Sequence, residues 1–519
     1  MALNLFGGGK VDHPMADPKR ARQIVDELPA SDAVKAVAEI TEWLESISET
    51  SGFKLDRRFE NVDLLDGAAK AHQRKLLQDY LAMPRQQRFQ ENRLWTGMFG
   101  LWKGFGDAYI RCVDEHEAGA SGAAAIRKNL PVIVARALRM LIQQLKWGLL
   151  RYAPMESRIW TDLARLYQLA ERKGFADAAI GIYPGAHESG TVKQEFLKGL
   201  VLAASAPDGL SPLCLEVAER VIAHFSGGFR LSDKPEGCTH CFDLATPRAP
   251  VRLLKGAAQT ATLRFLGATG AIAGLEQLTK RIGERGVVPG DVNLGGNYDK
   301  EVVLGVLKHL APQWSEAPPV RSAQRRQTAG SIMVVPGFAE ILGVLGASGT
   351  GDALDFSEEA PAQSADSWVV VNASEGSYGA IVPPKKSEWL KVGTLVGVKS
   401  EVSRHWGVGL VRRIAVDAHQ QRQVGIQLLT KAGIPVTIAR SGAAAPTNAE
   451  REAQTAILLS STPDDQGEVG VVLREGGFNG RDSLDITMQD QSFLLMPVLI
   501  VEDGDGFDWA RFKLMQRST

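Results

Sequence analysis

The sequence predicts a multidomain α+β protein with an all-α helical N-terminal half and an antiparallel β-barrel C-terminal half. The first observation is length, because 519 residues exceed the about 100–200 residues of one ordinary domain. The second is that apolar residues recur at helical spacing up to about residue 310. The third is that short runs rich in β-branched residues, separated by glycine and proline turns, fill the chain after about residue 320.

The first part of the chain is expected to hold a flexible tail at residues 1–16 and a helical domain at residues 17–150. Between residues 31 and 48, apolar side chains recur three and four positions apart, with Ser31 as the expected N-cap of the helix. Residues 92–113 show the same spacing with aromatic side chains. Because aromatic residues mostly fill cores, we interpret this stripe as a helix–helix contact rather than a cofactor site.

A second helical domain is expected at residues 151–310. Trp160, Leu163 and Tyr167 fit part of the tetratricopeptide pattern. The period of that repeat does not recur in the flanking sequence. We therefore expect one TPR-like hairpin and not a repeat array.

The most apolar helical stretch of the chain is residues 130–150. It contains Arg136, Arg139 and Lys146, and the cost of inserting such charges argues against a membrane span.

The second half follows an Arg-containing linker at residues 311–327. We expect a β-barrel at residues 328–440, interrupted by a small, acidic and polar insertion at residues 346–366, and an additional β subdomain at residues 454–519. The expected strands are 331–338, 367–374, 377–383, 394–400, 406–416, 423–429, 434–440, 454–460, 468–475, 483–488 and 493–503. So many short strands without a long helix between them predict an antiparallel barrel or sandwich, with two barrels in tandem as one possibility.

Composition limits the classes of function. The chain holds 59 Lys and Arg against 60 Asp and Glu, and the formal net charge of −1 argues against a long nucleic acid as partner. Hydrophobic residues at 44% and charged residues at 23% are typical of a folded globular protein. Four cysteines are too few for a disulfide scaffold, and the N-terminus lacks the apolar region of a signal peptide. We therefore expect a cytoplasmic protein.

Two elements in the β-rich half carry side chains suited to a ligand. Arg321, Arg325 and Arg326 form an R-x-x-x-R-R sequence just before the first expected strand. Guanidinium groups pair with phosphate oxygens in a bidentate way and also stack on or bond to guanine.

The second element is the sequence N-A-S-E-G-S-Y-G, which runs from Asn372 to Gly379. Asn372 and Ser374 are two positions apart on an expected strand, so their side chains are expected to point the same way. An amide and a hydroxyl can both bond to the edge of a guanine, and a glycine after them permits close approach of the backbone.

These elements, together with the sequences at 406–413 (WGVGLVRR) and 423–427 (QVGIQ), resemble the PilZ family of bacterial cyclic di-GMP receptors. That family has R-x-x-x-R on an arm before a six-stranded barrel and [DN]-x-S-x-x-G on a barrel strand and turn. The resemblance covers roughly residues 319–440, about a quarter of the chain, and Ser377 stands at the position of the family's glycine. A long helical region before the barrel is similar to the layout of large PilZ-type proteins.

The resemblance implies a cyclic di-GMP site on the barrel. The residues implied at the ligand are Arg321, Arg325, Arg326, Asn372, Ser374 and Gly379. It also implies an output in motility, pili or biofilm.

Cys238 and Cys241 form a C-x-x-C pair, which suits zinc or a thiol–disulfide couple. A zinc site needs further ligands, and His240 is the nearest additional donor. A redox pair is usually found at a helix N-terminus, whereas this pair lies in a loop flanked by proline and glycine. We expect chance loop cysteines and no metal, and an enzyme that uses the pair is the least favoured interpretation.

We therefore expect a non-enzymatic receptor that binds cyclic di-GMP at the barrel and an unidentified protein partner through the helical half. The alternative is a degenerate PilZ-like scaffold that binds protein and no nucleotide.

Overall fold

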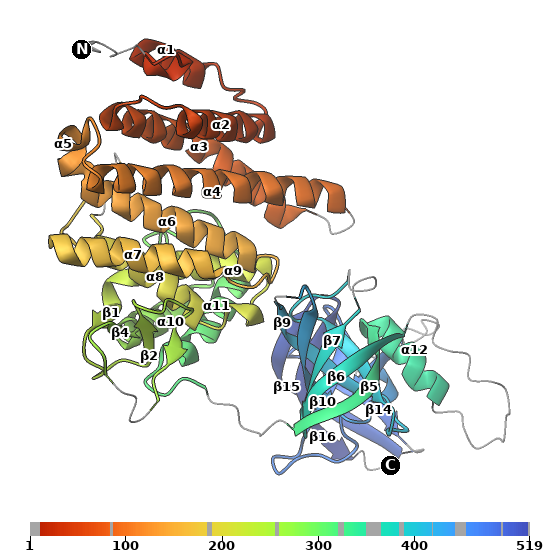
Figure 1. Cartoon of the computed structure of the whole chain (residues 1–519). Helices are drawn as coiled ribbons and strands as arrows, with labels where there is room; N and C mark the ends of the chain where they lie inside the picture. Colours follow the sequence, from red (N-terminus) through yellow and green to blue (C-terminus); the bar gives the residue numbers. More distant parts are fainter. Residues whose placement is uncertain are drawn as a thin grey trace, which may run out of the picture. The chain divides into compact units, whose positions relative to one another are not determined.

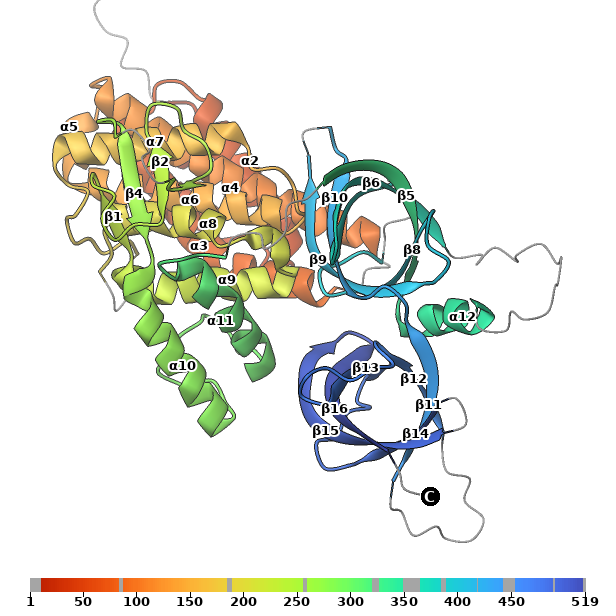
Figure 2. The ribbon, with the colours of Figure 1, turned by 90° about the horizontal axis from the view of Figure 1, so that it is seen from below.

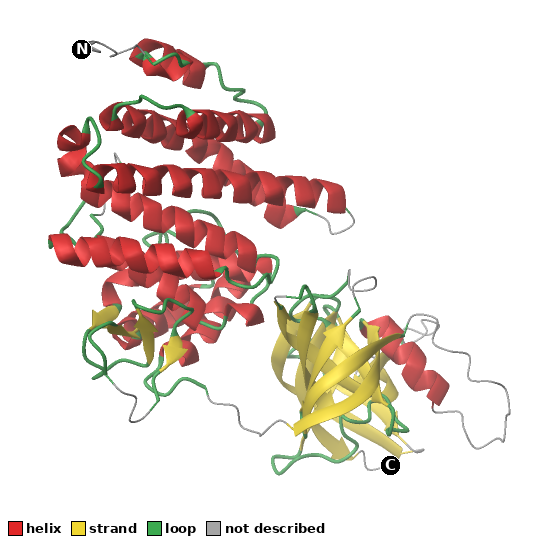
Figure 3. Cartoon of the chain, in the orientation of Figure 1, coloured by secondary structure: helices red, strands yellow, loops and turns green. Residues whose placement is uncertain are grey.

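A computed structural model describes most of the chain. The described residues are 11–83, 87–183, 189–254, 259–319, 326–348, 365–383, 389–417, 419–441, 453–488 and 491–516. The chain forms two compact units, residues 1–319 and 320–519, which are described separately below. Figures 1 and 3 show that the first unit is mostly helical and that the second consists mostly of strands, which confirms the predicted fold class.

Helices form most of the first unit. The α-helices are α1 (Pro18–Asp26), α2 (Ala33–Glu49), α3 (Leu55–Ala82), α4 (Arg88–Glu117), α5 (Ala123–Ile126), α6 (Leu130–Leu149), α7 (Ser157–Lys173), α8 (Val192–Ala204), α9 (Pro212–His224), α10 (Ile272–Arg285) and α11 (Lys300–Trp314). Short 3-10 helices are η1 (Pro14–Ala16), η2 (Arg127–Asn129), η3 (Pro207–Gly209), η4 (Ser226–Gly228) and η5 (Thr269–Ala271).

Helix α2 illustrates how the sequence pattern becomes core. Val37, Ile40 and Leu44 are buried along one face, as their spacing predicts. The N-cap is Asp32, whose side chain accepts a hydrogen bond from the backbone N–H of Lys35 at 3.0 Å, and not the expected Ser31.

The aromatic stripe of α4 packs into the helical core, as interpreted above. Phe105 and Tyr109 are fully buried, and Trp95 stacks on Phe99 with 4.8 Å between the ring centroids. Tyr109 donates a hydrogen bond to the buried carboxylate of Asp66 at 2.7 Å.

Helix α6 contacts α4, α7 and α8 and is the central helix of the unit. The basic residues that argued against a membrane span are used inside the core. Lys146 is 1% exposed, and its Nζ lies 2.6 Å from a carboxylate oxygen of the buried Glu216 on α9. Among the residues that the structure describes, no helix is both long and apolar enough to cross a membrane.

A small antiparallel sheet, which the sequence analysis did not predict, lies in the second part of this unit. Its strands are β1 (Arg230–Ser232), β2 (His240–Asp243), β3 (Val251–Arg252) and β4 (Leu263–Gly267), in the order β1-β4-β2-β3. The strands are too short to show a clear alternating pattern in the sequence.

The expected TPR-like hairpin corresponds to α7 and α8, which contact each other. Helix α7 ends at Gly174, which adopts the left-handed conformation, and α8 begins after a capping box formed by Thr191 and Gln194.

The second unit begins with a closed six-stranded barrel. Its strands are β5 (Arg326–Pro336), β6 (Asp366–Ser374), β7 (Ser377–Val382), β8 (Leu395–Ser400), β9 (Gly407–Val416) and β10 (Arg422–Thr430). They pair in the order β10-β7-β6-β5-β8-β9, and β9 closes onto β10. Figure 2 shows this barrel along its axis.

A second closed barrel follows directly. Its strands are β11 (Ile434–Arg440), β12 (Gln454–Leu458), β13 (Glu468–Arg474), β14 (Leu484–Met488), β15 (Gln491–Gly504) and β16 (Phe507–Gln516). Strand β11 pairs with β12 and β14, so it belongs to the second barrel and not to the first, where the sequence analysis placed it. The reason is that strand pattern alone does not reveal which sheet a strand joins.

Strand β16 was missing from the expected strands. It forms a hairpin with β15 through the two-residue loop Asp505-Gly506, in which Gly506 has a positive φ of 86°. An Asp-Gly pair is a strong signal for such a hairpin, so the sequence held the information.

The two barrels share a hydrophobic core with the short helix α12 (Phe338–Ser348). Helix α12 contacts β5 and β8 of the first barrel and β11 and β12 of the second. Ile341, Leu410 and Phe507 are among the fully buried residues of this cluster. Part of the expected insertion, residues 349–364, lies outside the described residues.

The buried ion pair of α6 generates a stability prediction. Replacing Lys146 by Met removes the cation that faces Glu216, although Arg220 still donates to the same carboxylate at 2.7 Å. We expect a loss of about 3 kcal/mol in the free energy of unfolding, the lower end of the range for breaking a buried pair. Urea unfolding followed by circular dichroism measures it.

The matched control is Lys35→Met, since the Lys35 side chain is 65% exposed and its Nζ lies 3.7 Å from Glu39. This change should cost less than about 1 kcal/mol. A Lys146→Met protein as stable as the control would contradict the structural role of the pair.

Candidate functional site

The candidate site lies on the outer face of the first barrel, across β5, β6, β7, β10 and β9. The strand register places Gln327, Asn372, Gly379, Gly425 and Arg413 opposite one another in a row. Directly opposed residues of antiparallel strands share a face of the sheet. The row therefore has polar side chains at both ends and two glycines in the middle.

A β-bulge at Val371 places Asn372 on this face. Trp368 and Val370 are buried inside the barrel, and strict alternation would add Asn372 to them. The register shifts between Val370 and Asn372, so that Val370 pairs with Ala380 and Asn372 pairs with Gly379. The extra residue turns the Asn372 side chain to the outer face.

Gly379 provides the space that the Asn372 side chain occupies. A Cβ atom at position 379 would lie only 2.5 Å from Oδ1 of Asn372 and 2.9 Å from its Cγ. This Oδ1 is buried, and no hydrogen-bond donor contacts it in the part of the chain that the structure describes. A buried acceptor without a partner is costly, so the site is suited to a ligand that donates a hydrogen bond here.

The predicted side chain of Ser374 lies on the same face, at the end of β6. Its Oγ is 2.7 Å from Oγ of Ser377, the first residue of β7. The serine that replaces the family's glycine is thus bonded to a predicted site residue, and the pair presents two hydroxyls beside Asn372.

Arg412 and Arg413 differ from the expectation that follows from strand alternation. A second bulge makes Arg412 the extra residue of β9, since Arg413 pairs with Gly425 and Val411 pairs with Ile426. Both arginines therefore lie on the outer face, and the expectation of opposite faces was wrong.

Arg412 is held between the two barrels. Its Nε donates to Oε1 of Gln427 at 2.7 Å, and its guanidinium forms an ion pair with Glu502 of β15 at 2.7 Å. Arg413, Gln327 and Gln427 are site residues that the sequence analysis did not assign. A bulge leaves no clear signal in a sequence, which is why the row could not be predicted.

The arginine arm is described in part. Arg321 and Arg325 lie outside the described residues. Arg326 is the first residue of β5, is exposed, and pairs with Ala373. Since Gln327 pairs with Asn372, the neighbouring Arg326 starts on the opposite side of the strand, at the end of the barrel.

The cysteine pair lies apart from this face, in the first unit. Cys241 is on β2 and Cys238 is in the preceding turn, and burial raises the pKa of both thiols. Burial and the nearby Arg252 lower the pKa of His240 to about 4. Within the described ranges, no group of three or more His, Cys, Asp or Glu side chains could hold a metal ion.

Comparisons with known proteins agree with this architecture. A family model described as "Cyclic-di-GMP receptor FimW, N-terminal domain" matches residues 19–236. A second model, described as "Cyclic-di-GMP receptor FimW, middle PilZ domain", matches residues 350–435, which include Asn372, Ser374 and Gly379. No curated protein matches the chain.

The two models describe successive domains of one family, and together they cover more than half of the chain. The resemblance to PilZ proteins with a helical N-terminal region is thereby confirmed. The chain belongs to the FimW family of PilZ-domain cyclic-di-GMP receptors.

Proposed function

We propose that this protein is a cytoplasmic, non-enzymatic receptor that binds cyclic di-GMP on the outer face of the first barrel. The residues proposed to contact the nucleotide are Arg321, Arg325, Arg326, Asn372, Ser374 and Gly379. The observation that carries this proposal is the buried Oδ1 of Asn372, which has no donor among the described residues and lies against Gly379.

The chemistry of the ligand fits this face. Guanine has N–H donors on one edge and acceptors on another, so the Asn372 amide and the hydroxyls of Ser374 and Ser377 can bond to it. The two phosphates need cations, which Arg321 and Arg325 supply from the segment just before β5. Membership of the FimW family supports the same ligand.

We propose in addition that nucleotide binding is coupled to a protein partner of the helical unit. The division between the two compact units falls at residues 319 and 320, next to Arg321 and Arg325. A ligand that binds these arginines therefore acts on the connection between the units. Ordering of that connection is a physical route from the barrel to the helical surface.

The arginine arm is tested by Arg325→Ala. Loss of a bidentate guanidinium contact should weaken cyclic di-GMP binding about 5- to 150-fold, which corresponds to about 1–3 kcal/mol. We expect a smaller loss for Arg326→Ala, because Arg326 starts on the other side of β5 from Asn372. Isothermal titration calorimetry on the full chain measures both.

The matched control is Arg440→Ala, an exposed arginine at the end of β11 in the second barrel. It should bind like the unmodified protein. Absence of saturable binding to the unmodified protein at micromolar nucleotide would reject the proposed ligand.

The packing of Asn372 on Gly379 gives a second test. In Gly379→Ala the new methyl group would displace the Asn372 side chain from the position shown here, so binding should weaken by at least about tenfold, or about 1.4 kcal/mol. Gly376→Ala is the control, because no atom lies within 4 Å of a Cβ at that turn position. Equal affinities for the two variants would argue against a role for this contact.

Coupling to a partner is tested by affinity capture with the full chain. We expect the amount of captured partner to change when cyclic di-GMP is added, and Arg325→Ala to remove that dependence. Capture that ignores both the nucleotide and the substitution would favour the alternative of a scaffold that binds only protein.

A further inference from the structure

The helical unit contains a pocket that the proposed function does not use. Its volume is about 280 Å³, and it lies between one face each of α3, α4 and α6. Its floor and walls come from residues at helical spacing, such as Lys70, Gln73 and Arg74 on α3 and Arg139 and Lys146 on α6. Every described residue of this pocket belongs to the first unit.

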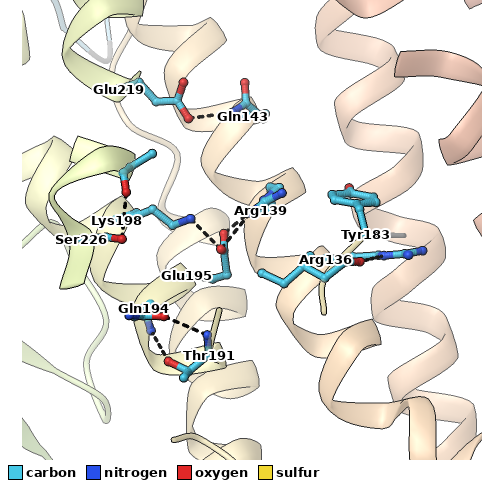
Figure 4. A network of polar contacts seen from close by, with 12 residues as sticks. Arg136, Arg139, Gln143, Tyr183, Thr191, Gln194, Glu195, Lys198, Glu219 and Ser226 are labelled. Carbon is cyan, nitrogen blue, oxygen red and sulfur yellow. Dashed lines mark hydrogen bonds and ion pairs between the residues drawn. The ribbon is translucent and has the colours of Figure 1, made fainter. Parts of the chain in front are cut away.

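The charged groups that line the pocket are all basic. They are Lys70, Arg74, Arg139, Lys146 and Arg220, and no carboxylate is among the lining residues. Three of them are neutralised from behind: Glu195 pairs with Arg139 at 2.8 Å, and Glu216 pairs with Lys146 at 2.6 Å and with Arg220 at 2.7 Å. Figure 4 shows Glu195 between Arg139 and Lys198.

Lys70 and Arg74 are different from these three. In the described ranges, neither forms an ion pair with a carboxylate. Lys70 instead lies over the ring of Tyr183, with its Nζ 3.0 Å from the ring centroid, and Arg74 Nε donates to the backbone carbonyl of Lys70 at 3.3 Å. The pocket therefore carries two positive charges that an anion could neutralise.

Two buried donors in the pocket also lack an acceptor. Gln73 and Trp102 are each 9% exposed, and neither Nε2 of Gln73 nor Nε1 of Trp102 has a hydrogen-bond partner in the described structure. Unpaired buried donors are rare and need an acceptor to offset their desolvation. Donors and cations together select an anion that is rich in acceptor oxygens.

The pocket also has an aromatic wall. Trp102, Trp147 and Tyr183 line it together with the apolar side chains of Leu77 and Met98. Such a wall suits the flat ring of a ligand rather than an inorganic ion alone.

We propose that this pocket binds a small aromatic phosphate monoester of mononucleotide size. A phosphate monoester carries about −1.5 to −2 charges at neutral pH, which matches Lys70 and Arg74, whereas a monocarboxylate would neutralise only one of them. Its oxygens would accept from Gln73 and Trp102, and its ring would lie against the aromatic wall. The volume is at the low end of the about 300–1,000 Å³ of ligand pockets, so a cyclic dinucleotide is too large.

Calorimetry on the full chain tests this proposal with defined probes. GMP and AMP represent the aromatic phosphate, guanosine lacks the phosphate, and inorganic phosphate lacks the ring. We expect saturable binding of at least one mononucleotide, and binding at least about tenfold weaker for guanosine and for inorganic phosphate.

Two substitutions place the binding in the pocket. Lys70→Met keeps the apolar stem over Tyr183 but removes the charge, and Trp102→Phe keeps a ring but removes the unpaired donor. We expect Lys70→Met to weaken mononucleotide binding by at least about tenfold and Trp102→Phe to weaken it measurably. Lys75→Met is the control, because Lys75 is on the same helix but exposed and paired with Asp79 at 3.1 Å.

The outcomes separate this proposal from the barrel site. Arg325→Ala should leave mononucleotide binding unchanged, and saturating cyclic di-GMP should not compete with GMP. The proposal is overturned if no mononucleotide binds, if guanosine or inorganic phosphate binds as tightly as GMP, or if a folded Lys70→Met protein binds like Lys75→Met. Thermal unfolding of each variant shows whether it is folded.

Discussion

Closure of the first six-stranded sheet is the constraint on which the candidate site depends. A closed sheet has no free edge, because the backbone N–H and C=O groups of every strand pair with a neighbour. A barrel this small also needs local bends, which β-bulges provide. The bulges at Val371 and Arg412 interrupt the alternation of side chains and place Asn372 and Arg413 on the outer face. The polar face is thus a consequence of how the barrel closes.

The second barrel supports that face from one side. Helix α12 and residues of both barrels form one hydrophobic cluster, so the strands that carry Arg412 and Arg413 are packed against a rigid neighbour. Arg412 adds a polar link, because it donates to Gln427 of the first barrel and pairs with Glu502 of the second. Preorganised side chains lose less entropy when a ligand binds, which favours recognition on a fixed surface.

In the helical unit, buried charges have a comparable organising role. Carboxylates of α8 and α9 neutralise Arg139, Lys146 and Arg220 from behind, so the lining of the pocket can be basic without repelling itself. Burying a charge is tolerated only when such a partner is present. Lys70 and Arg74 have no carboxylate partner in the described ranges, and this contrast distinguishes a ligand pocket from a purely structural network.

The sequence by itself determined the fold class, most of the strands and the family, because hydrophobic period, turn residues and short motifs are local properties. It also identified Asn372, Ser374 and Gly379 as a group, which the structure places together at the β6–β7 pair. Strand partners, the role of β11, the small sheet of the first unit and the bulge at Arg412 were decided only by the tertiary structure. These features depend on pairing between distant segments and on one-residue register shifts, neither of which leaves a periodic signal in the chain.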